Sequence, residues 1–152
     1  MNWNAVSAIG EIVGLVIIVV SLVYLARQVK QNTNAIQSGT REAFLSALQN
    51  SNSFALQNSD VWHRGAFAGE ELQGEDLTRY VTIVHSALNA YEALYSEYLA
   101  GNVEQEFWDG KVRQMRWTFE QPSSRYAWEN FAHLFDERFV KYVNENVASS
   151  VA

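Results

Sequence analysis

The chain has 152 residues, which is enough for one ordinary domain or for a smaller domain with an appendage. Its 11 basic and 17 acidic side chains give a formal charge of −6 with no dense Lys/Arg cluster, and this argues against binding to nucleic acid. Zero cysteines exclude disulfides and thiolate metal sites, and a single proline favours helices over a turn-rich β architecture.

The first 26 residues form the most apolar part of the chain, with one acidic and no basic side chain. As a helix, residues 5–26 would extend about 33 Å, which matches a hydrocarbon core of about 30 Å. The uninterrupted run 12–26 would reach only about 22 Å, so either Glu11 lies within the membrane or the bilayer thins around it. A cleavable signal peptide fits poorly because the preceding tail has no Lys or Arg and no cleavage site follows. A buried helix this apolar would be unusual in so small a chain. We therefore expect a transmembrane helix with a short tail in residues 1–31.

The charges on either side of this segment predict its orientation. No basic side chain precedes it, whereas Arg27, Lys30 and Arg41 follow it. Because basic residues are retained on the cytoplasmic side, the amino terminus should face outward and the larger carboxy-terminal part should be cytoplasmic. Trp3 and Tyr24 lie near the two ends of the segment, where aromatic rings favour the membrane interface.

Small and polar residues gather on one side of the expected helix. On a seven-residue repeat they fall in one row and its two neighbours: Ser7, Gly10, Glu11, Gly14, Ser21 and Gln28. Small residues let helices approach closely, and a period near 3.5 is typical of left-handed packing. A carboxylate near the bilayer centre costs about 3 kcal/mol, so Glu11 should face protein or water. We expect these six residues to form the interface of a homo-oligomer.

Three roles remain open for Glu11. A ring of Glu11 carboxylates could line a path for cations or protons. Alternatively, the group could sit silently at the outer headgroup boundary, with the helix displaced inward or the bilayer thinned. A protonated or paired Glu11 could also hold the subunits together. The pattern favours oligomerisation over conduction.

Helical patterns continue beyond the membrane segment. Residues 27–39 are polar on most faces, with a weak point expected at Gly39. Residues 40–57 resume helical spacing after a start signal at Thr40. Residues 58–76 read as a short helix and a loop, with three glycines expected as breaks: Gly65, Gly69 and Gly74.

The clearest soluble helix is predicted for residues 76–100, where apolar side chains recur at steps of three and four. Gly101 should end it in the position after the C-cap. Further helices are expected over residues 103–119, from residue 123 to about residue 135, and over residues 137–147.

The expected fold is all-α, with a transmembrane helix in residues 1–31 that continues into a cytoplasmic antiparallel helical bundle in residues 32–152. The opening "AIGEIVGLVIIVVSLVYLARQVKQNT" and the closing "RYAWENFAHLFDERFVKYV" resemble those of small, uncharacterised bacterial single-span inner-membrane proteins. These two segments make up about a third of the chain, and neither is a catalytic motif. The resemblance implies a location in the bacterial inner membrane and no particular activity.

Motifs for catalysis and metal binding are lacking in the sequence. There is no phosphate-binding loop, nucleophile elbow or zinc-protease motif. The best metal candidate is Glu129, His133 and Glu137, which would share a face of an unbroken helix opposite His85 and Glu92. The Glu-x-x-His pairs of di-metal bundles are missing, however. We predict no catalytic residue, no metal ligand and no cofactor.

Aromatic residues crowd the second half of the chain. Eleven of them are Tyr91, Tyr95, Tyr98, Phe107, Trp108, Trp117, Phe119, Tyr126, Trp128, Phe131 and Phe135. They could frame an apolar ligand pocket, but their helical spacing favours a hydrophobic core.

The predicted function is that of a homo-oligomeric membrane protein whose partners are itself and the lipid bilayer. Conduction of cations or protons past Glu11 would extend this function. One alternative is an accessory subunit that docks on a larger membrane protein. Another is a membrane-tethered enzyme using the Glu129 and His133 face, or a tethered ligand-binding protein.

Overall fold

The computed structural model describes residues 3–150, with the side chains of residues 11–149. Over residues 3–150 the chain is helical with no β-strand, which confirms the all-α prediction. It divides into two units, Met1–Ser38 and Gly39–Ala152, which are described separately below as unit 1 and unit 2.

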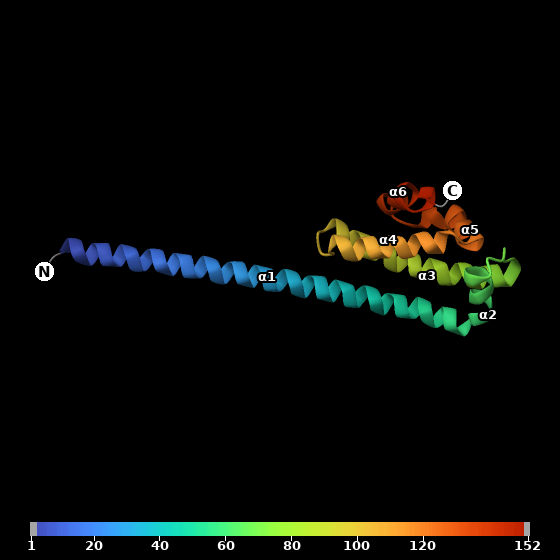
Figure 1. Cartoon of the computed structure of the whole chain (residues 1–152), viewed down its shortest axis with the longest axis horizontal. Coiled ribbons are helices and arrows are strands. Elements are labelled where there is room, and N and C mark those ends of the chain that lie inside the picture. Colours follow the sequence, from blue (N-terminus) through green and yellow to red (C-terminus); the bar gives the residue numbers. More distant parts are fainter. Residues whose placement is uncertain (1–2, 151–152) are drawn as a thin grey trace. The chain divides into compact units, whose positions relative to one another are not determined.

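The first helix, α1, runs without a break from Trp3 to Gln57 and so contributes to both units (Figure 1). At Gly39, where a weak point was expected, the helix does not break, although the division between the two units falls immediately before this residue. A lone glycine costs a helix only about 1 kcal/mol relative to alanine, and the residues around it follow a helical pattern.

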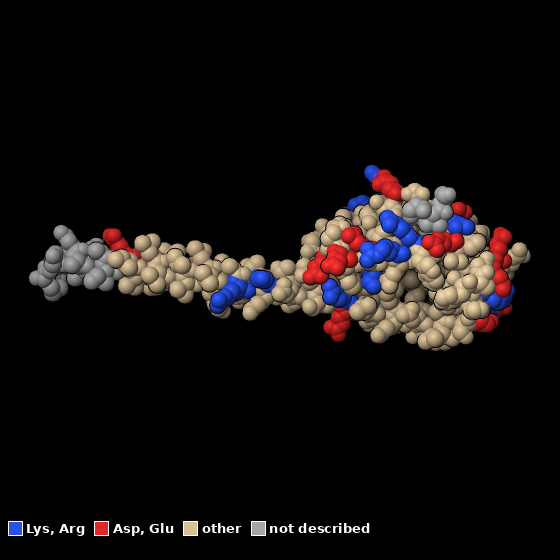
Figure 2. Space-filling model, in the orientation of Figure 1, with Lys and Arg blue, Asp and Glu red and all other residues tan. Residues whose placement is uncertain are grey.

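The described part of unit 1 carries its apolar side chains on the outside. All the large apolar side chains from Ile12 to Leu25 are exposed. In Figure 2 the part of this helix between the red acidic atoms and the blue basic atoms is tan throughout on the face shown. Within the described residues, α1 is the one helix long and apolar enough to cross a membrane. A helix in water would instead bury an apolar stripe against a partner.

Unit 2 begins with the last part of α1 and continues through a short, irregular connection to a long helix. The elements are α2 (Ser59–Trp62), the π-helical turn η1 (His63–Phe67) and α3 (Gly74–Leu99). The short helix and loop predicted for residues 58–76 are therefore present.

The three glycines of this connection do different things. Gly69 and Gly74 have φ angles of +66° and +58°. Gly69 follows the end of η1 and Gly74 is the first residue of α3, so both lie where regular structure is interrupted, as predicted. Gly65 does not break the helical path, contrary to the prediction, but lies inside η1. A Cβ on Gly65 would lie 2.5 Å from a ring carbon of Tyr80, so glycine is required there for close packing.

The long helix α3 ends as the sequence predicts. Gly101 has a φ of +80°, and its backbone N–H donates to the carbonyl of Tyr98 at 3.0 Å. The N–H of Asn102 donates to the carbonyl of Glu97 at 2.9 Å, which completes a Schellman motif.

Further helical elements complete unit 2 among the described residues. They are three α-helices, α4 (Gln105–Phe119), α5 (Pro122–Phe131) and α6 (Glu137–Asn146), together with two 3₁₀ turns, η2 (Ala132–Leu134) and η3 (Ala148–Ser150), which makes five elements in all. Helix α3 packs against α4 and α5, which also contact each other (Figure 1). The helix expected up to about residue 135 is shorter than predicted, because η2 interrupts it after Phe131 and the Asp136 carboxylate caps α6 through the N–H of Arg138 at 2.9 Å.

Aromatic side chains build much of the core of unit 2. Trp108 is completely buried, and its ring lies between 5.2 and 5.4 Å from the rings of Tyr95, Tyr98 and Tyr142. Its indole N–H donates to the hydroxyl of Tyr142 at 2.9 Å. The core interpretation is confirmed for the members of the aromatic set that are buried: Tyr91, Tyr95, Trp108, Phe119, Trp128 and Phe135. Trp117 and Tyr126 are exposed instead.

Candidate functional site

The polar row predicted in unit 1 lies on one uninterrupted helix. Ser7 and Gly10 fall outside the residues whose side chains are described. Gly14 is half-buried, and a Cβ built on it would meet no heavy atom within 4 Å. Open space above a glycine is what a second helix needs for close approach.

The other members of the row present exposed polar groups. The Ser21 hydroxyl donates to the carbonyl of Ile17 at 2.8 Å, so this side chain is satisfied within its own helix. The side chains of Glu11 and Gln28 are exposed, and neither forms a hydrogen bond or ion pair with any described residue. The row therefore offers a small-residue surface with Glu11 and Gln28 as its unpaired polar groups.

The structure does not assemble the metal candidate of the sequence analysis. Glu129 belongs to α5, His133 to η2 and Glu137 to α6, so the unbroken helix that would align them is missing. No three His, Cys, Asp or Glu side chains gather as a metal site among the described residues. The Glu92 carboxylate instead accepts the backbone N–H of Asp136, and the His85 ring packs 5.0 Å from Phe135.

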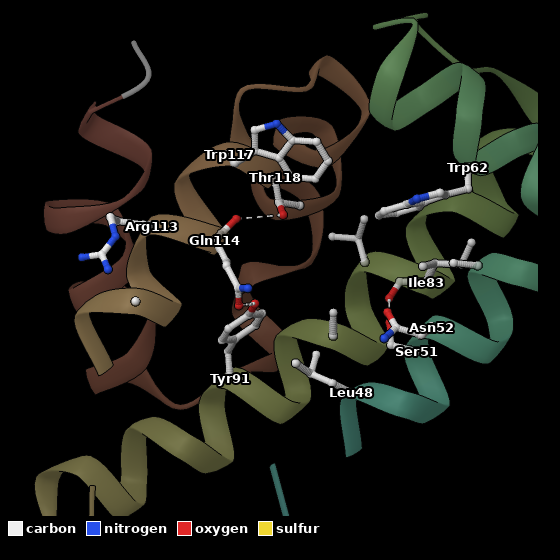
Figure 3. A pocket seen from close by; sticks show the side chains of 14 residues that line it. Leu48, Ser51, Asn52, Trp62, Ile83, Tyr91, Arg113, Gln114, Trp117 and Thr118 are labelled. Atoms are coloured by element: carbon white, nitrogen blue, oxygen red, sulfur yellow. Dashed lines mark hydrogen bonds between the residues drawn. The ribbon is translucent and has the colours of Figure 1, made fainter. Parts of the chain in front are cut away.

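Unit 2 contains a cavity that the sequence analysis did not place. It has a volume of about 510 Å³. It lies between the carboxy-terminal part of α1, the middle of α3 and α4, with Trp62 of α2 at one side. We call it the slot, and its apolar lining includes Leu48, Ala55, Trp62, Ile83, Ala87 and Trp117 (Figure 3). Volume and lining are both typical of a small-molecule site.

Polar groups line part of the slot. The Ser51 hydroxyl donates to the carbonyl of Ile83 at 3.0 Å. The Tyr91 hydroxyl donates to the Gln114 side-chain oxygen at 3.4 Å, and burial raises the pKa of Tyr91 to about 12. In Figure 3 the Gln114 side chain reaches toward Tyr91, whereas Arg113 is directed away from the slot. The slot interior therefore holds neutral groups at neutral pH.

A second cavity of about 520 Å³ adjoins the slot along α4, and we call it the polar hollow. It is lined by three cations, Arg41, Lys111 and Arg113, and by the carboxylates Glu104 and Glu106. Arg41 forms an ion pair with Glu104 at 2.8 Å. Both cavities are lined by Gly110, Arg113 and Gln114, so they lie on either side of the same turn of α4.

Lys111 has an unusual setting within the polar hollow. Its ammonium group lies 5.4 Å from the ring centre of Phe44 and 5.0 Å from that of Phe107. It donates one hydrogen bond, to the Gln114 side-chain oxygen at 3.1 Å, and pairs with no carboxylate among the described residues. Partial burial, and next the charge of Arg41, lower the pKa of Lys111.

One signal in the sequence could have pointed to this region. The stretch from Phe107 to Trp117 combines large rings with three basic residues, and Trp117 is exposed although its spacing resembles that of core residues.

No family model, curated protein or solved structure matches the chain.

Proposed function

We propose that the chain is a single-span protein of the bacterial inner membrane that self-associates through α1. The observation that carries this proposal is the fully exposed apolar surface of the helix between Ile12 and Leu25. Exposed apolar area of this extent is unfavourable in water, and lipid is the solvent that accepts it. The basic residues that follow the span support a cytoplasmic unit 2 and an outward-facing amino terminus.

The polar row supports self-association as the use of this span. Lipid-facing positions need no small residues, whereas helix contacts in membranes favour them. Gly14 and Ser21 lie one heptad apart on the same side as Glu11, and the space next to Gly14 is open. A second copy of the same helix would cover these positions and remove Glu11 from contact with acyl chains.

Association is tested with Gly14→Ile, which fills the open space, and with Val16→Ile as a matched control on the opposite face of the same helix. The full chain is reconstituted in zwitterionic lipid, and its stoichiometry is measured by native mass spectrometry or single-molecule photobleaching. We expect one defined oligomer for the unaltered chain and Val16→Ile, and dissociation for Gly14→Ile. A chain that is monomeric unless a partner co-purifies would favour the accessory-subunit alternative.

Conduction past Glu11 is a further part of the proposal with its own test. Liposomes containing the oligomer should show a cation or proton flux that Glu11→Gln abolishes while the oligomer stays intact. Equal flux in both proteins, or no flux in either, would limit the function to assembly.

A further inference from the structure

The slot is an apolar cavity at the surface of an otherwise well-packed unit. Trp108, Phe119 and Phe139 are almost completely buried, whereas Trp117 at the slot is 42% exposed. No buried side-chain nitrogen or oxygen lacks a hydrogen-bond partner among the described residues, so the surrounding structure is satisfied without a ligand. An open cavity flanked by Trp62 and Trp117 offers an apolar ligand large ring surfaces to contact.

The side chains that line the polar hollow next to the slot carry a net positive charge, whereas the chain as a whole is negative. The chain carries a net charge of −6, but the hollow has three cations and two carboxylates, of which Glu104 is paired with Arg41. Arg113 forms no hydrogen bond or ion pair with any described residue, and Lys111 has no carboxylate partner among them. These two cations are therefore available to an anion of a single charge, which would offset the local excess of one positive charge.

A side chain that can move stands between the two cavities. The Gln114 amide oxygen accepts a 3.4 Å bond from Tyr91 on the slot side and a 3.1 Å bond from Lys111 on the hollow side. Gln114 itself is exposed, so it can rotate into water. Gly110, one turn away, has no side chain to block the passage, and a Cβ there would meet only Arg113 at 3.7 Å.

We infer that the slot and the polar hollow together bind a single-chain amphiphile with a monoanionic head, a long-chain carboxylate. The apolar chain lies in the slot against Trp62 and Trp117, and the carboxylate lies in the hollow between Lys111 and Arg113. Binding displaces Gln114 from Lys111, because the carboxylate is a stronger acceptor for the ammonium group than an amide oxygen.

The inference is tested by photo-crosslinking of the full chain in nanodiscs of phosphatidylcholine. The probe is a long-chain carboxylate with a diazirine in its chain, and labelled residues are identified by mass spectrometry. We expect labelling at slot residues such as Leu48, Ile83 and Trp117. Two further probes share the chain and carry a neutral alcohol or a phosphate monoester, and both should label the slot about tenfold less than the carboxylate.

Variants of the hollow separate its charge from its shape. Arg113→Gln and Lys111→Gln should each reduce labelling several-fold, whereas Lys141→Gln, which removes a cation elsewhere in unit 2, should leave it unchanged. Because Lys111 packs over two rings, its variant is compared by circular dichroism, and Arg113→Gln, at an exposed and unpaired side chain, tests the inference independently of folding. Ala55→Phe, which fills the slot, should abolish labelling.

Three results would overturn the inference. Equal labelling by the alcohol and the carboxylate would show that the hollow does not select an anion. Labelling confined to α1 between residues 12 and 26, with none in the slot, would show that the probe only dissolves in the bilayer. Stronger labelling by the phosphate monoester would replace the carboxylate by a phosphate-bearing lipid as the ligand.

Discussion

The two ends of α1 belong to one continuous helix but place their apolar residues differently. Between Ile12 and Leu25 the large apolar side chains are all exposed, and they surround the helix except along the row that contains Gly14 and Ser21. Between Gly39 and Gln57 the inward positions Phe44, Leu48 and Ser51 recur at steps of three and four, and Phe44 and Ser51 are buried in unit 2. The backbone is helical in both parts, so the different placement of the apolar side chains indicates which surroundings each part requires. The apolar side chains of one end suit lipid, and the other end suits a protein core on one side and water on the other.

The largest expected effect comes from removing a ring that only the core of unit 2 needs. Trp108→Ala deletes a completely buried indole and its hydrogen bond to Tyr142, so we expect a loss of about 3 to 5 kcal/mol in unfolding free energy. Val19→Ala, at a side chain 58% exposed in unit 1, should leave the unfolding of unit 2 unchanged. Near-ultraviolet circular dichroism during thermal or chemical unfolding measures both variants. A comparable loss in Val19→Ala would show that unit 2 depends on the apolar surface of unit 1.

An arginine placed in each part of α1 tests whether the first part lies in lipid and the second part lies in water. Val19→Arg should weaken membrane insertion by about 2.5 to 3.5 kcal/mol, because arginine would replace a residue near the bilayer centre. Leu56→Arg makes the same kind of change at a side chain that is 77% exposed in unit 2, and it should have no effect on insertion. The measurement is the fraction of chain that resists alkaline extraction from membranes. If both variants are extracted alike, the apolar run of unit 1 is not the span.

Sequence patterns predicted the elements that depend on local chemistry. The end of α3 at Gly101 follows from a residue that adopts positive φ without strain, and the exposed run of unit 1 follows from composition alone. The predictions that failed depend on tertiary packing. Gly65 looked like a helix breaker because the contact with Tyr80, which makes glycine necessary, joins residues far apart in the sequence.

The slot and the polar hollow could not be located from the sequence for a similar reason, although the aromatic residues left an apolar pocket open as an alternative. Their walls come from α1, α3 and α4, and the spacing of Trp117 is that of a core residue. Only the packed structure shows that its ring stays exposed beside a cavity. The metal candidate that the sequence offered is not assembled, because a short 3₁₀ turn after Phe131 ends the helix that would have aligned Glu129, His133 and Glu137.

Two glycines in helical segments give a matched pair of substitutions, one expected to lower the unfolding free energy and the other to raise it. A Cβ on Gly65 would lie 2.5 and 2.6 Å from ring carbons of Tyr80, whose ring is buried, stacks on Trp62 and is held by Ser124 at 2.9 Å. Gly65→Ala should therefore destabilise unit 2 by about 1 to 3 kcal/mol. Gly39→Ala meets nothing within 4 Å and should stabilise the helix by about 0.5 to 1 kcal/mol. The denaturation midpoints of the two variants give the comparison, and a neutral Gly65→Ala would mean that the Tyr80 ring can shift.

The last prediction concerns a pH dependence that belongs to unit 2, involves the slot and is absent at neutral pH. Burial raises the pKa of Tyr91 to about 12, whereas an unfolded tyrosine ionises near pH 10. The folded chain therefore keeps this proton between about pH 10 and pH 12 while the unfolded chain loses it. The stability that Tyr91 contributes is complete below pH 10 and is lost as the pH rises toward 12.

Tyr91→Phe removes this titration and provides the measurement. Between about pH 10 and pH 12 the unfolding free energy of the unaltered chain should fall more steeply than that of Tyr91→Phe, by up to about 1.4 kcal/mol per pH unit. At pH 8 the two proteins should differ little, because the variant loses only the long 3.4 Å bond to Gln114. Parallel curves up to pH 12 would mean that water reaches the Tyr91 hydroxyl through the slot, since hydration of the phenolate would return its pKa to the unfolded value.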